Sequence, residues 1–379
     1  MRPPLEGIRV LDFSTLLPGP MATLVLAEAG AEVIKIERPE RGDEMRSYVP
    51  KFGEDSVNFA LLNRGKRSVA IDLKAPNAVD RLRPLVDSAD VLVEQFRPGV
   101  MDRLGLGYEA LSQTNPGLVY CSITGYGQSG PRAGEASHDL NYLAETGMLA
   151  LAGDREGAPV VPGVLVADLA GGTYPAIVNI LLALHARVQT GRGRRLDISM
   201  CDNLFPLMYW ALGNGFAAGA WPRPGGELVT GGSPRYQIYR TKVGGFIAAA
   251  PLEEKFWQNF CEVIGLDVGL RDDSRDPAAT IAAVQRIIAS ATATEWAAAF
   301  AGRDACCNVM QGLEDAVNDP HFRARGLFAH TLSAGGESIP ALPMPLDPSL
   351  RRPSGESSGY PALGADNRLL DADDDGDTP

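Results

Sequence analysis

The sequence predicts an α/β fold built on an open sheet of parallel strands. Short apolar, β-branched runs alternate with helix-like stretches along the first 200 residues, and Gly or Pro separates them. The chain has 379 residues, of which 45% are hydrophobic and 22% charged, a composition typical of folded proteins rather than disordered ones. This length allows two or three domains, or one large α/β domain with an excursion.

The first predicted unit is strand, helix, strand. The run IRVLDFS at 8–14 predicts a strand, the turn Leu17-Pro18-Gly19-Pro20 follows, residues 21–31 predict a helix, and EVIKIER at 32–38 predicts a second strand. Proline suits the first turn of a helix, and Gly30 suits its end. Two strands joined through a helix run parallel in one sheet.

The alternation of predicted strands and helices continues along the chain. Strands are predicted at 66–73, 89–96, 118–125 and 194–200, with helices at 77–89 and 171–189. The Gly- and Pro-rich loop 221–236 is the main internal break, and a β-hairpin around Gly244-Gly245 is expected after it. We therefore expect a large domain over 1–200, a smaller α+β domain over 225–325, a wrapping arm over 330–365, and an acidic, disordered tail over 366–379.

Composition argues against several classes of function. The formal net charge is −12, which disfavours a nucleic-acid-binding surface. The N-terminus lacks an apolar run typical of a signal peptide, and the apolar windows 174–185 and 203–212 are shorter than the roughly 20 residues that a bilayer requires, so we expect a cytoplasmic protein without a membrane partner. The five scattered cysteines suit neither a disulfide framework nor a zinc site.

Several motifs of common cofactor and hydrolase families are missing from the places where they would act. The second predicted strand ends in Glu37-Arg38, where a dinucleotide-binding fold contacts ribose, but the preceding turn lacks GxGxxG. The chain also lacks GxxxxGK[ST] and HExxH. ATP chemistry and zinc proteolysis thus have no motif to support them, and a nicotinamide or flavin cofactor has none at the first strand-helix turn.

Two side chains are candidates for chemistry on local grounds. His138 lies in a loop after a predicted strand, where α/β folds place functional groups. Asp168 lies in an apolar run just before glycines and a helix, so it either caps that helix or acts as an acid, a base or a nucleophile. Basic side chains gather near the predicted strand ends and suggest either a solvated surface or a polyanion site: Arg38, Arg64, Lys66, Arg67, Arg97 and Arg103.

Five longer segments, at 5–43, 62–74, 93–111, 123–131 and 190–202, resemble the class III CoA-transferase and α-methylacyl-CoA racemase superfamily, which is CaiB/BaiF-like. The resemblance extends from about residue 4 to about residue 345. It implies a Rossmann-like large domain made of N- and C-terminal segments, a small domain, and two chains interlocked as a homodimer, with the 330–365 arm returning to the large domain.

The resemblance also implies that coenzyme A enters as part of the substrate, with no covalently bound cofactor and no metal. Arg38, Arg97 and Arg103 are expected near its phosphates or adenine. The nucleotide site is expected to be lined by Leu16, Leu17, Ile71, Phe96 and Leu104.

The two branches of the superfamily differ in mechanism. Asp168 matches the acid of both: a nucleophile that becomes an aspartyl-CoA thioester in transferases, a general acid/base in racemases. His138, in the run HDLNY, matches the racemase pattern, and Glu253 matches its acidic partner, although Glu254 beside it leaves that assignment open by one residue. The 221–236 loop lacks the long glycine run of formyl-CoA-type transferases, which also favours the racemase branch.

The sequence thus predicts an acyl-CoA enzyme that inverts 2-methylacyl-CoA thioesters by 1,1-proton transfer through an enolate. Backbone amides near Asp168 and the following glycines are the expected donors to the enolate oxygen. The alternatives are a CoA-transferase with Asp168 as nucleophile, and a CoA-binding protein that has lost its chemistry. The acyl chain is not specified by the sequence.

Overall fold

The computed structural model describes residues 2–153, 157–352 and 359–371 and divides into two compact units. The first unit comprises Met1–Leu143, Gly163–Leu207 and Pro320–Pro379, and the second comprises Ala144–Pro162 and Met208–Asp319. The segment 144–162 was expected in the large domain. It belongs to the second unit, where Gly153 lies against Pro224 of that unit's loop.

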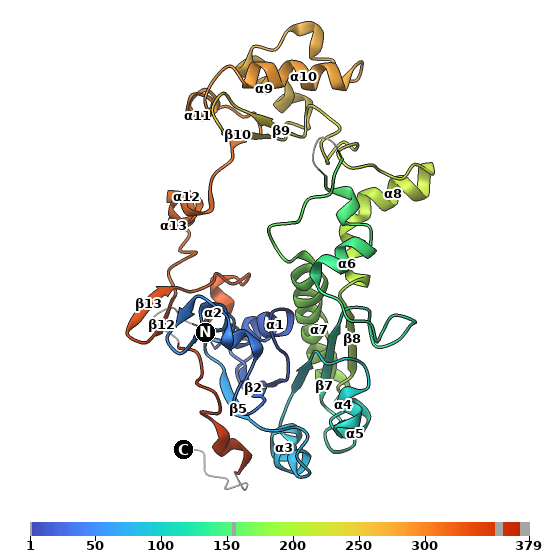
Figure 1. Ribbon diagram of the computed structural model, residues 1–379, viewed down its shortest axis with the longest axis vertical. Helices are drawn as coiled ribbons and strands as arrows, with labels where there is room; N and C mark the ends of the chain where they lie inside the picture. The colour runs from blue at the N-terminus through green and yellow to red at the C-terminus, as the bar shows by residue number, and fades with distance from the viewer. Residues whose placement is uncertain (1, 154–156, 353–358, 372–379) are drawn as a thin grey trace. The chain divides into compact units, whose positions relative to one another are not determined.

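Within the described residues of the first unit, six strands form one sheet in the order β5-β2-β1-β6-β7-β8, and every neighbouring pair is parallel (Figure 1). The strands are β1 (Arg9–Asp12), β2 (Glu32–Glu37), β5 (Arg67–Ala70), β6 (Val91–Glu94), β7 (Val119–Thr124) and β8 (Arg195–Ser199). Each lies inside a segment predicted to be a strand. The predicted α/β class with a parallel sheet is confirmed.

Helices cover this sheet, and the short β3-β4 hairpin lies beside them. Helix α1 is apolar on all sides, which suits its burial between the sheet, α2 and α7. Its residues Leu24 and Leu26 are fully buried. Helix α7 lies beside β7 and β8 (Figure 1). The elements of this layer are α1 (Pro18–Glu28), η1 (Glu44–Ser47), β3 (Lys51–Phe52), β4 (Asp55–Ser56), α2 (Val57–Asn63), α3 (Ala78–Asp87), α4 (Val100–Arg103), α5 (Tyr108–Thr114), α6 (Asp139–Glu145), α7 (Tyr174–Thr190) and η4 (Asp202–Met208).

A buried charged cluster supports the turn between β1 and α1. Asp12 accepts hydrogen bonds from the Thr23 hydroxyl at 2.6 Å and from Lys66 Nζ at 3.0 Å, and both members of this ion pair are fully buried. Burial alone would favour a neutral acid, but Lys66 and Lys35 hold the pKa of Asp12 far below its usual range. Burial lowers the pKa of Lys66 to about 8, an effect that Asp12 partly opposes.

A second buried pair holds the rest of the turn. Lys35 Nζ lies 2.9 Å from Asp43 Oδ2 and donates to the Ser14 carbonyl at 2.7 Å. The Leu16 N–H points at the Asp43 carboxylate, with distances of 3.2 and 3.3 Å to its two oxygens. Leu16 has a φ of 61°, a left-handed backbone conformation that is energetically unfavourable for a residue with a Cβ. The Asp43 contact therefore stabilises a strained turn that the chain would otherwise relax.

Three of the six basic residues considered for a polyanion site serve the fold instead. Arg64 pairs with Glu28 at 2.8 Å, and Lys66 pairs with Asp12. Arg67 on the edge strand β5 pairs with Asp366 at 2.9 Å. The polyanion-site interpretation of these three residues is wrong, because the sheet and helices turn them toward buried or half-buried carboxylates.

The C-terminal segment returns to the first unit. It contains α13 (Pro320–Ala324), the hairpin of β12 (Thr331–Ala334) and β13 (Glu337–Pro340), η6 (Pro348–Leu350) and η7 (Asn367–Leu370). Asp366 exchanges hydrogen bonds with Ser68 along the open edge of β5, and Leu370 joins the hydrophobic core. The expectation of a disordered tail from residue 366 is therefore wrong for 366–371, since these residues cover a sheet edge. Residues 372–379 lie outside the described part of the chain.

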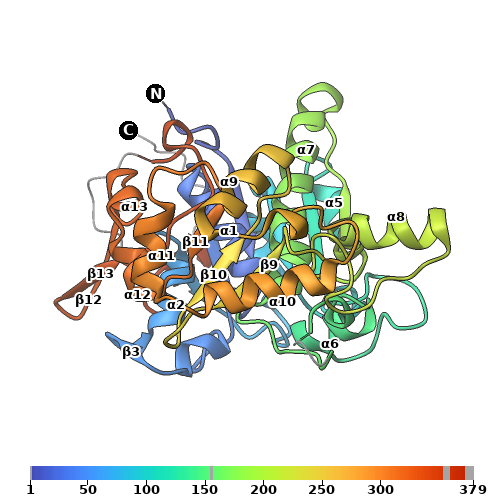
Figure 2. The same ribbon diagram turned by 90° about the horizontal axis from the view of Figure 1, so that it is seen from above.

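The second unit is built on an antiparallel sheet of order β11-β10-β9. The hairpin predicted around Gly244-Gly245 is confirmed as β9 and β10, and α10 packs against β9 (Figure 2). Trp257, Phe260 and Phe300 stack in its core. Its elements are η2 (Leu149–Leu151), α8 (Tyr209–Ala218), β9 (Gln237–Arg240), β10 (Phe246–Ala249), α9 (Glu254–Ile264), η5 (Val268–Leu270), α10 (Pro277–Ile288), α11 (Ala293–Phe300), β11 (Cys307–Val309) and α12 (Leu313–Asn318).

One helix of the first unit is longer than the sequence suggested. A π-helical turn, η3 (Ala167–Thr173), runs directly into α7, so that Ala167–Thr190 forms one helix of 24 residues. Its length and apolar composition meet the requirements of a membrane span, which corrects the expectation that the apolar windows are too short. A single such helix is weak evidence for a membrane protein, because core helices of soluble proteins also meet these requirements.

Candidate active site

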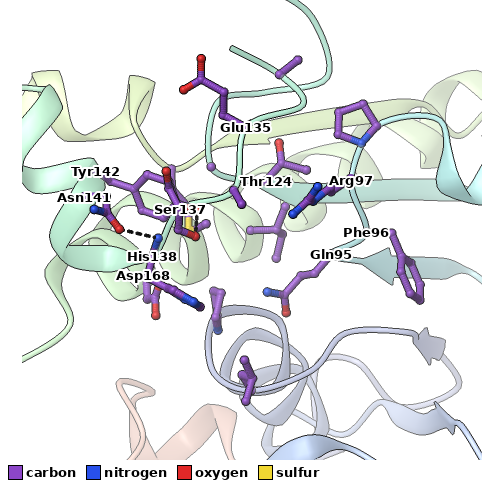
Figure 3. A pocket seen from close by; sticks show the side chains of 18 of the residues that line it. Gln95, Phe96, Arg97, Thr124, Glu135, Ser137, His138, Asn141, Tyr142 and Asp168 are labelled. Carbon is purple, nitrogen blue, oxygen red and sulfur yellow. Dashed lines mark hydrogen bonds between the residues drawn. The ribbon is translucent and has the colours of Figure 1, made fainter.

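Two neighbouring cavities open in the first unit where the parallel strands end. One, of about 410 Å³, is lined by His138 and Asp168 among others, and Figure 3 shows it from close by. The other, of about 380 Å³, is lined by Arg38. Thr15 and Phe96 line both cavities. The carboxyl ends of parallel strands are where open α/β sheets bind ligands.

The run HDLNY holds His138 by its backbone. His138 immediately precedes α6, its N–H donates to Asn141 Oδ1 at 3.1 Å (Figure 3), and its carbonyl accepts from the Asn141 N–H at 2.9 Å. The buried Tyr142 hydroxyl donates to the Ser137 carbonyl at 2.8 Å. The backbone on both sides of His138 is thus anchored, while its side chain remains exposed in the cavity wall. The sequence did not reveal these roles of Asn141 and Tyr142.

Asp139, the second residue of that run, links His138 to Asp168. Asp139 Oδ1 accepts hydrogen bonds from the Ala167 N–H at 2.6 Å and from the Asp168 N–H at 3.1 Å. The helix-capping role considered for Asp168 therefore belongs to Asp139, which leaves the Asp168 carboxylate available for chemistry. The amides of Ala167 and Asp168 are among the donors expected for the enolate oxygen, and in this structure both point at Asp139.

Asp168 is half-buried, and its surroundings favour the protonated acid. Burial and the neighbouring Asp139 carboxylate raise the pKa of Asp168 to about 6, and only the nearby His138 acts in the opposite direction. A carboxyl group with this pKa is mostly ionised at pH 7 yet accepts a proton at little cost. Such a group is suited to proton transfer near neutral pH.

The π-helical turn that carries Asp168 depends on its glycines. A Cβ on Gly171 would clash with the Met200 carbonyl, and one on Gly172 would lie 3.1 Å from Pro18 Cβ. The glycines therefore allow this turn to approach both α1 and the end of β8. This close approach explains the glycines after Asp168 without assigning them a role in catalysis.

The second cavity collects several of the residues expected around a nucleotide: Arg38, Ile71, Phe96 and Leu104. Lys74 adds another cation to this wall. It was not predicted from the sequence, although it follows the end of β5. Arg38 Nε donates to the Gly42 carbonyl at 2.9 Å, which orients its guanidinium group.

The other expected ligand contacts are distributed differently. Leu16 and Arg97 line the cavity of His138 and Asp168 rather than the second one. Leu17 and Arg103 line neither of these two cavities: Leu17 precedes α1 and accepts from the Met21 N–H at 2.9 Å, and Arg103 is the last residue of α4.

Comparison with known proteins identifies the family. A profile of CoA-transferase family III matches residues 5–367. The chain belongs to CoA-transferase family III. It is 37% identical over 347 residues to alpha-methylacyl-CoA racemase from Mus musculus, covering 90% of this chain and 86% of the relative. It is 33% identical over 350 residues to acetyl-CoA:oxalate CoA-transferase from Acetobacter aceti, covering 90% and 88%.

A solved structure agrees with this assignment. The crystal structure of a CAIB/BAIF family protein from Brucella suis matches with a TM-score of 0.82 and 28% identity, covering 98% of this chain and 99% of that one. The resemblance stated from the sequence is thereby confirmed. Because racemases and transferases of family III match at similar identity, the comparisons leave the reaction itself open.

The second unit of this family III chain carries Glu253 and Glu254, which have different surroundings. Glu253 lies at the N-cap position of α9, exposed and without a side-chain capping bond. Glu254 lies 2.9 Å from Arg235 and accepts from Gln258 at 2.6 Å. Glu254 is thus engaged within its own unit, which makes Glu253 the better candidate for a functional acid.

The described residues contain no group of three or more His, Cys, Asp or Glu side chains arranged to hold a metal ion. The five cysteines are free, and Cys306 is the exposed one. The two cavities instead offer cations and apolar walls, which suit an anionic nucleotide.

Proposed function

We propose that this chain is a racemase of 2-methylacyl-CoA thioesters that works by 1,1-proton transfer. The observation that carries the proposal is that His138 and Asp168, two proton-transfer groups on anchored backbone, line one cavity. An α-proton of a thioester is only weakly acidic, so inversion requires a base on one face and an acid on the other. The similarity to alpha-methylacyl-CoA racemase supports the same reaction.

The two cavities suit the two ends of a CoA thioester. Arg38 and Lys74 provide cations for phosphates in the second cavity, and Ile71 and Leu104 provide apolar contacts for adenine. The thioester would then lie in the cavity of His138 and Asp168. Phe96, which lines both cavities, would contact the arm that connects the two ends.

The proton transfers balance within this pair of residues. The Asp168 carboxylate removes the α-proton from one face of the thioester, and an enolate forms. Protonated His138 then donates a proton to the opposite face, which inverts the stereocentre. The enzyme is left with a protonated Asp168 and a neutral His138, the state that catalyses the reverse inversion. Because one proton is shared by two groups, their titrations should be coupled.

We propose that Glu253 also takes part in the reaction, as the resemblance to the racemase branch implies. Glu253→Gln should lower the rate of α-proton exchange at least about tenfold and shift its pH profile, because a neutral amide cannot carry the charge of the carboxylate. Glu254→Gln is the matched control, since Glu254 already pairs with Arg235. Equal effects of the two substitutions, or a change in stability alone, would exclude this role for Glu253.

The direct test is proton NMR of a chiral 2-methylacyl-CoA in D2O without an acceptor acid. We expect loss of the α-proton signal together with inversion, and loss of both in His138→Gln and Asp168→Asn. His321→Gln and Asp80→Asn make the same changes at exposed positions and should retain activity. Absence of exchange, followed by a new thioester once free acids are added and trapping of an acyl group on Asp168, would identify a CoA-transferase instead.

We also propose that the chain acts as a homodimer through the outer face of α7. Large apolar side chains are exposed along this face at helical spacing: Tyr174, Val178, Leu181, Leu182 and Val188, the last with 85% of its surface exposed. Monomers rarely expose so continuous an apolar face, and a second copy can cover it symmetrically. Sedimentation should show a dimer in detergent-free buffer and a monomer for Leu182→Glu. A wild-type monomer, or recovery only with membranes, would contradict this.

A further inference from the structure

Gln95, which directly follows β6, is held in one orientation by the start of α1. The Gly19 N–H donates to Gln95 Oε1 at 2.9 Å. Because the oxygen end of this carboxamide accepts that hydrogen bond, its other end, Nε2, is the donor. Gln95 lines the cavity of His138 and Asp168, and Figure 3 shows its carboxamide pointing into that cavity.

The surrounding chain is shaped for this contact. Gly19 lies between Pro18 and Pro20, which have no N–H, so it provides the one backbone donor of these three residues. A Cβ on Gly19 would lie 2.3 Å from Ser14 Cβ and 2.5 Å from Gln95 Oε1, so only glycine fits between these two side chains. On the other side of Gln95, the Phe96 N–H donates to Glu94 Oε2 at 2.7 Å. The Gly19 N–H thus anchors the Gln95 side chain, and the Phe96–Glu94 bond bridges the backbone around it, as a preorganised donor requires.

We propose that Gln95 Nε2 donates a hydrogen bond to the thioester carbonyl oxygen, on which negative charge develops. This inference deepens the proposed function and rests on a CoA thioester occupying the cavity. It provides a donor in place of the Ala167 and Asp168 amides, which Asp139 occupies. The same donor would serve the tetrahedral oxyanion of acyl transfer, so it does not depend on which of the two reactions occurs.

The test compares Gln95→Glu and Gln95→Met with the wild type. The carboxylate retains an acceptor for Gly19 but lacks the donor, and the methionine removes both without adding charge. We expect kcat for α-proton exchange to fall on the order of 10²-fold in both variants, with much smaller changes in KM. Gln113→Glu, the same change on exposed α5, is the matched control.

A binding measurement separates the thioester oxygen from other carbonyl groups of the ligand. Acetyl-CoA contains the thioester oxygen, whereas the thioether S-ethyl-CoA lacks it, and both contain the amide carbonyls of the pantetheine arm. We expect the Gln95 variants to lose affinity for acetyl-CoA but not for S-ethyl-CoA. Equal losses for both would place Gln95 on a pantetheine carbonyl and overturn the proposal, as would an unchanged kcat in either variant.

The outcome remains interpretable if the proposed function fails. A wild-type enzyme that shows CoA transfer but no proton exchange would refute the racemase assignment, and the kcat of transfer would then test Gln95. A wild-type enzyme inactive in both assays still leaves the binding comparison, in which unchanged affinity for acetyl-CoA overturns the proposal.

Discussion

Asp168 should make the folded protein less stable at neutral pH than an uncharged residue would. Folding moves the pKa of this carboxyl group from 3.8 to about 6, because burial and the Asp139 carboxylate disfavour its charge. Asp168→Asn replaces the carboxyl group with a neutral group of the same shape. The variant should therefore be more stable than the wild type wherever the wild-type carboxyl group is ionised.

The size of the effect follows from the two pKa values. Below pH 3.8 the acid is protonated in both states, so it does not change the free energy of unfolding. As the pH rises from 3.8 to about 6, the unfolded chain loses its proton first, and the folded state loses stability relative to it. Above pH 6 the ionised Asp168 lowers the free energy of unfolding by its full amount, about 3 kcal/mol. Between pH 4.5 and pH 8, the advantage of Asp168→Asn should grow by about 2 kcal/mol.

Urea denaturation at fixed protein concentration, repeated across this pH range, measures the difference. Asp80→Asn on exposed α3 controls for the loss of one negative charge. The variant should gain stability with rising pH while losing proton-exchange activity, as expected for a residue kept for function. A constant difference between pH 4.5 and pH 8 would refute the electrostatic argument.

Three other substitutions test the surroundings of the site. Asp139→Asn retains the acceptor for the two backbone amides but removes a negative charge, so the pKa of Asp168 should fall. The acidic limb of the pH profile of the exchange rate should then move to lower pH. An acidic limb that stays in place would contradict this. Lys66→Met leaves Asp12 buried without its ion-pair partner and should cost about 3–5 kcal/mol of unfolding free energy, partly recovered by adding Asp12→Asn; no recovery would argue against the pair. Gly19→Ala places a Cβ 2.3 Å from Ser14 Cβ and 2.5 Å from Gln95 Oε1 and should cost about 1–3 kcal/mol in urea denaturation, whereas wild-type stability would show that the turn can shift.

Local patterns were sufficient for the elements of this protein. The alternation of apolar runs with helix-like stretches predicted the six strands of the parallel sheet, and paired glycines marked the β9-β10 hairpin. The position of a strand or a tight turn depends mainly on residues close together in the chain, so the order of residue types in the sequence is enough to predict it. The resemblance of longer segments then identified the family, with His138 and Asp168 as candidates for chemistry.

Local patterns also had limits. The short hairpin of β12 and β13 was missed because its strands lack a regular apolar alternation. The sequence likewise did not show that the π-helical turn before α7 lengthens that helix to 24 residues. In both places, packing against distant segments outweighed local preference.

The roles of individual polar side chains were decided only by the tertiary structure. Asp139 and Asp168 are both acids near a helix start, and the fold gives the capping bonds to Asp139, 28 residues before the Ala167 amide that it binds. Gln95 carried no signal in the sequence, yet its carboxamide meets the Gly19 amide, 76 residues away. Whether a carboxylate is a cap, an ion-pair partner or a reactive group depends on which donor lies within about 3 Å of it. Long-range packing sets that distance, and no local pattern in the sequence encodes it.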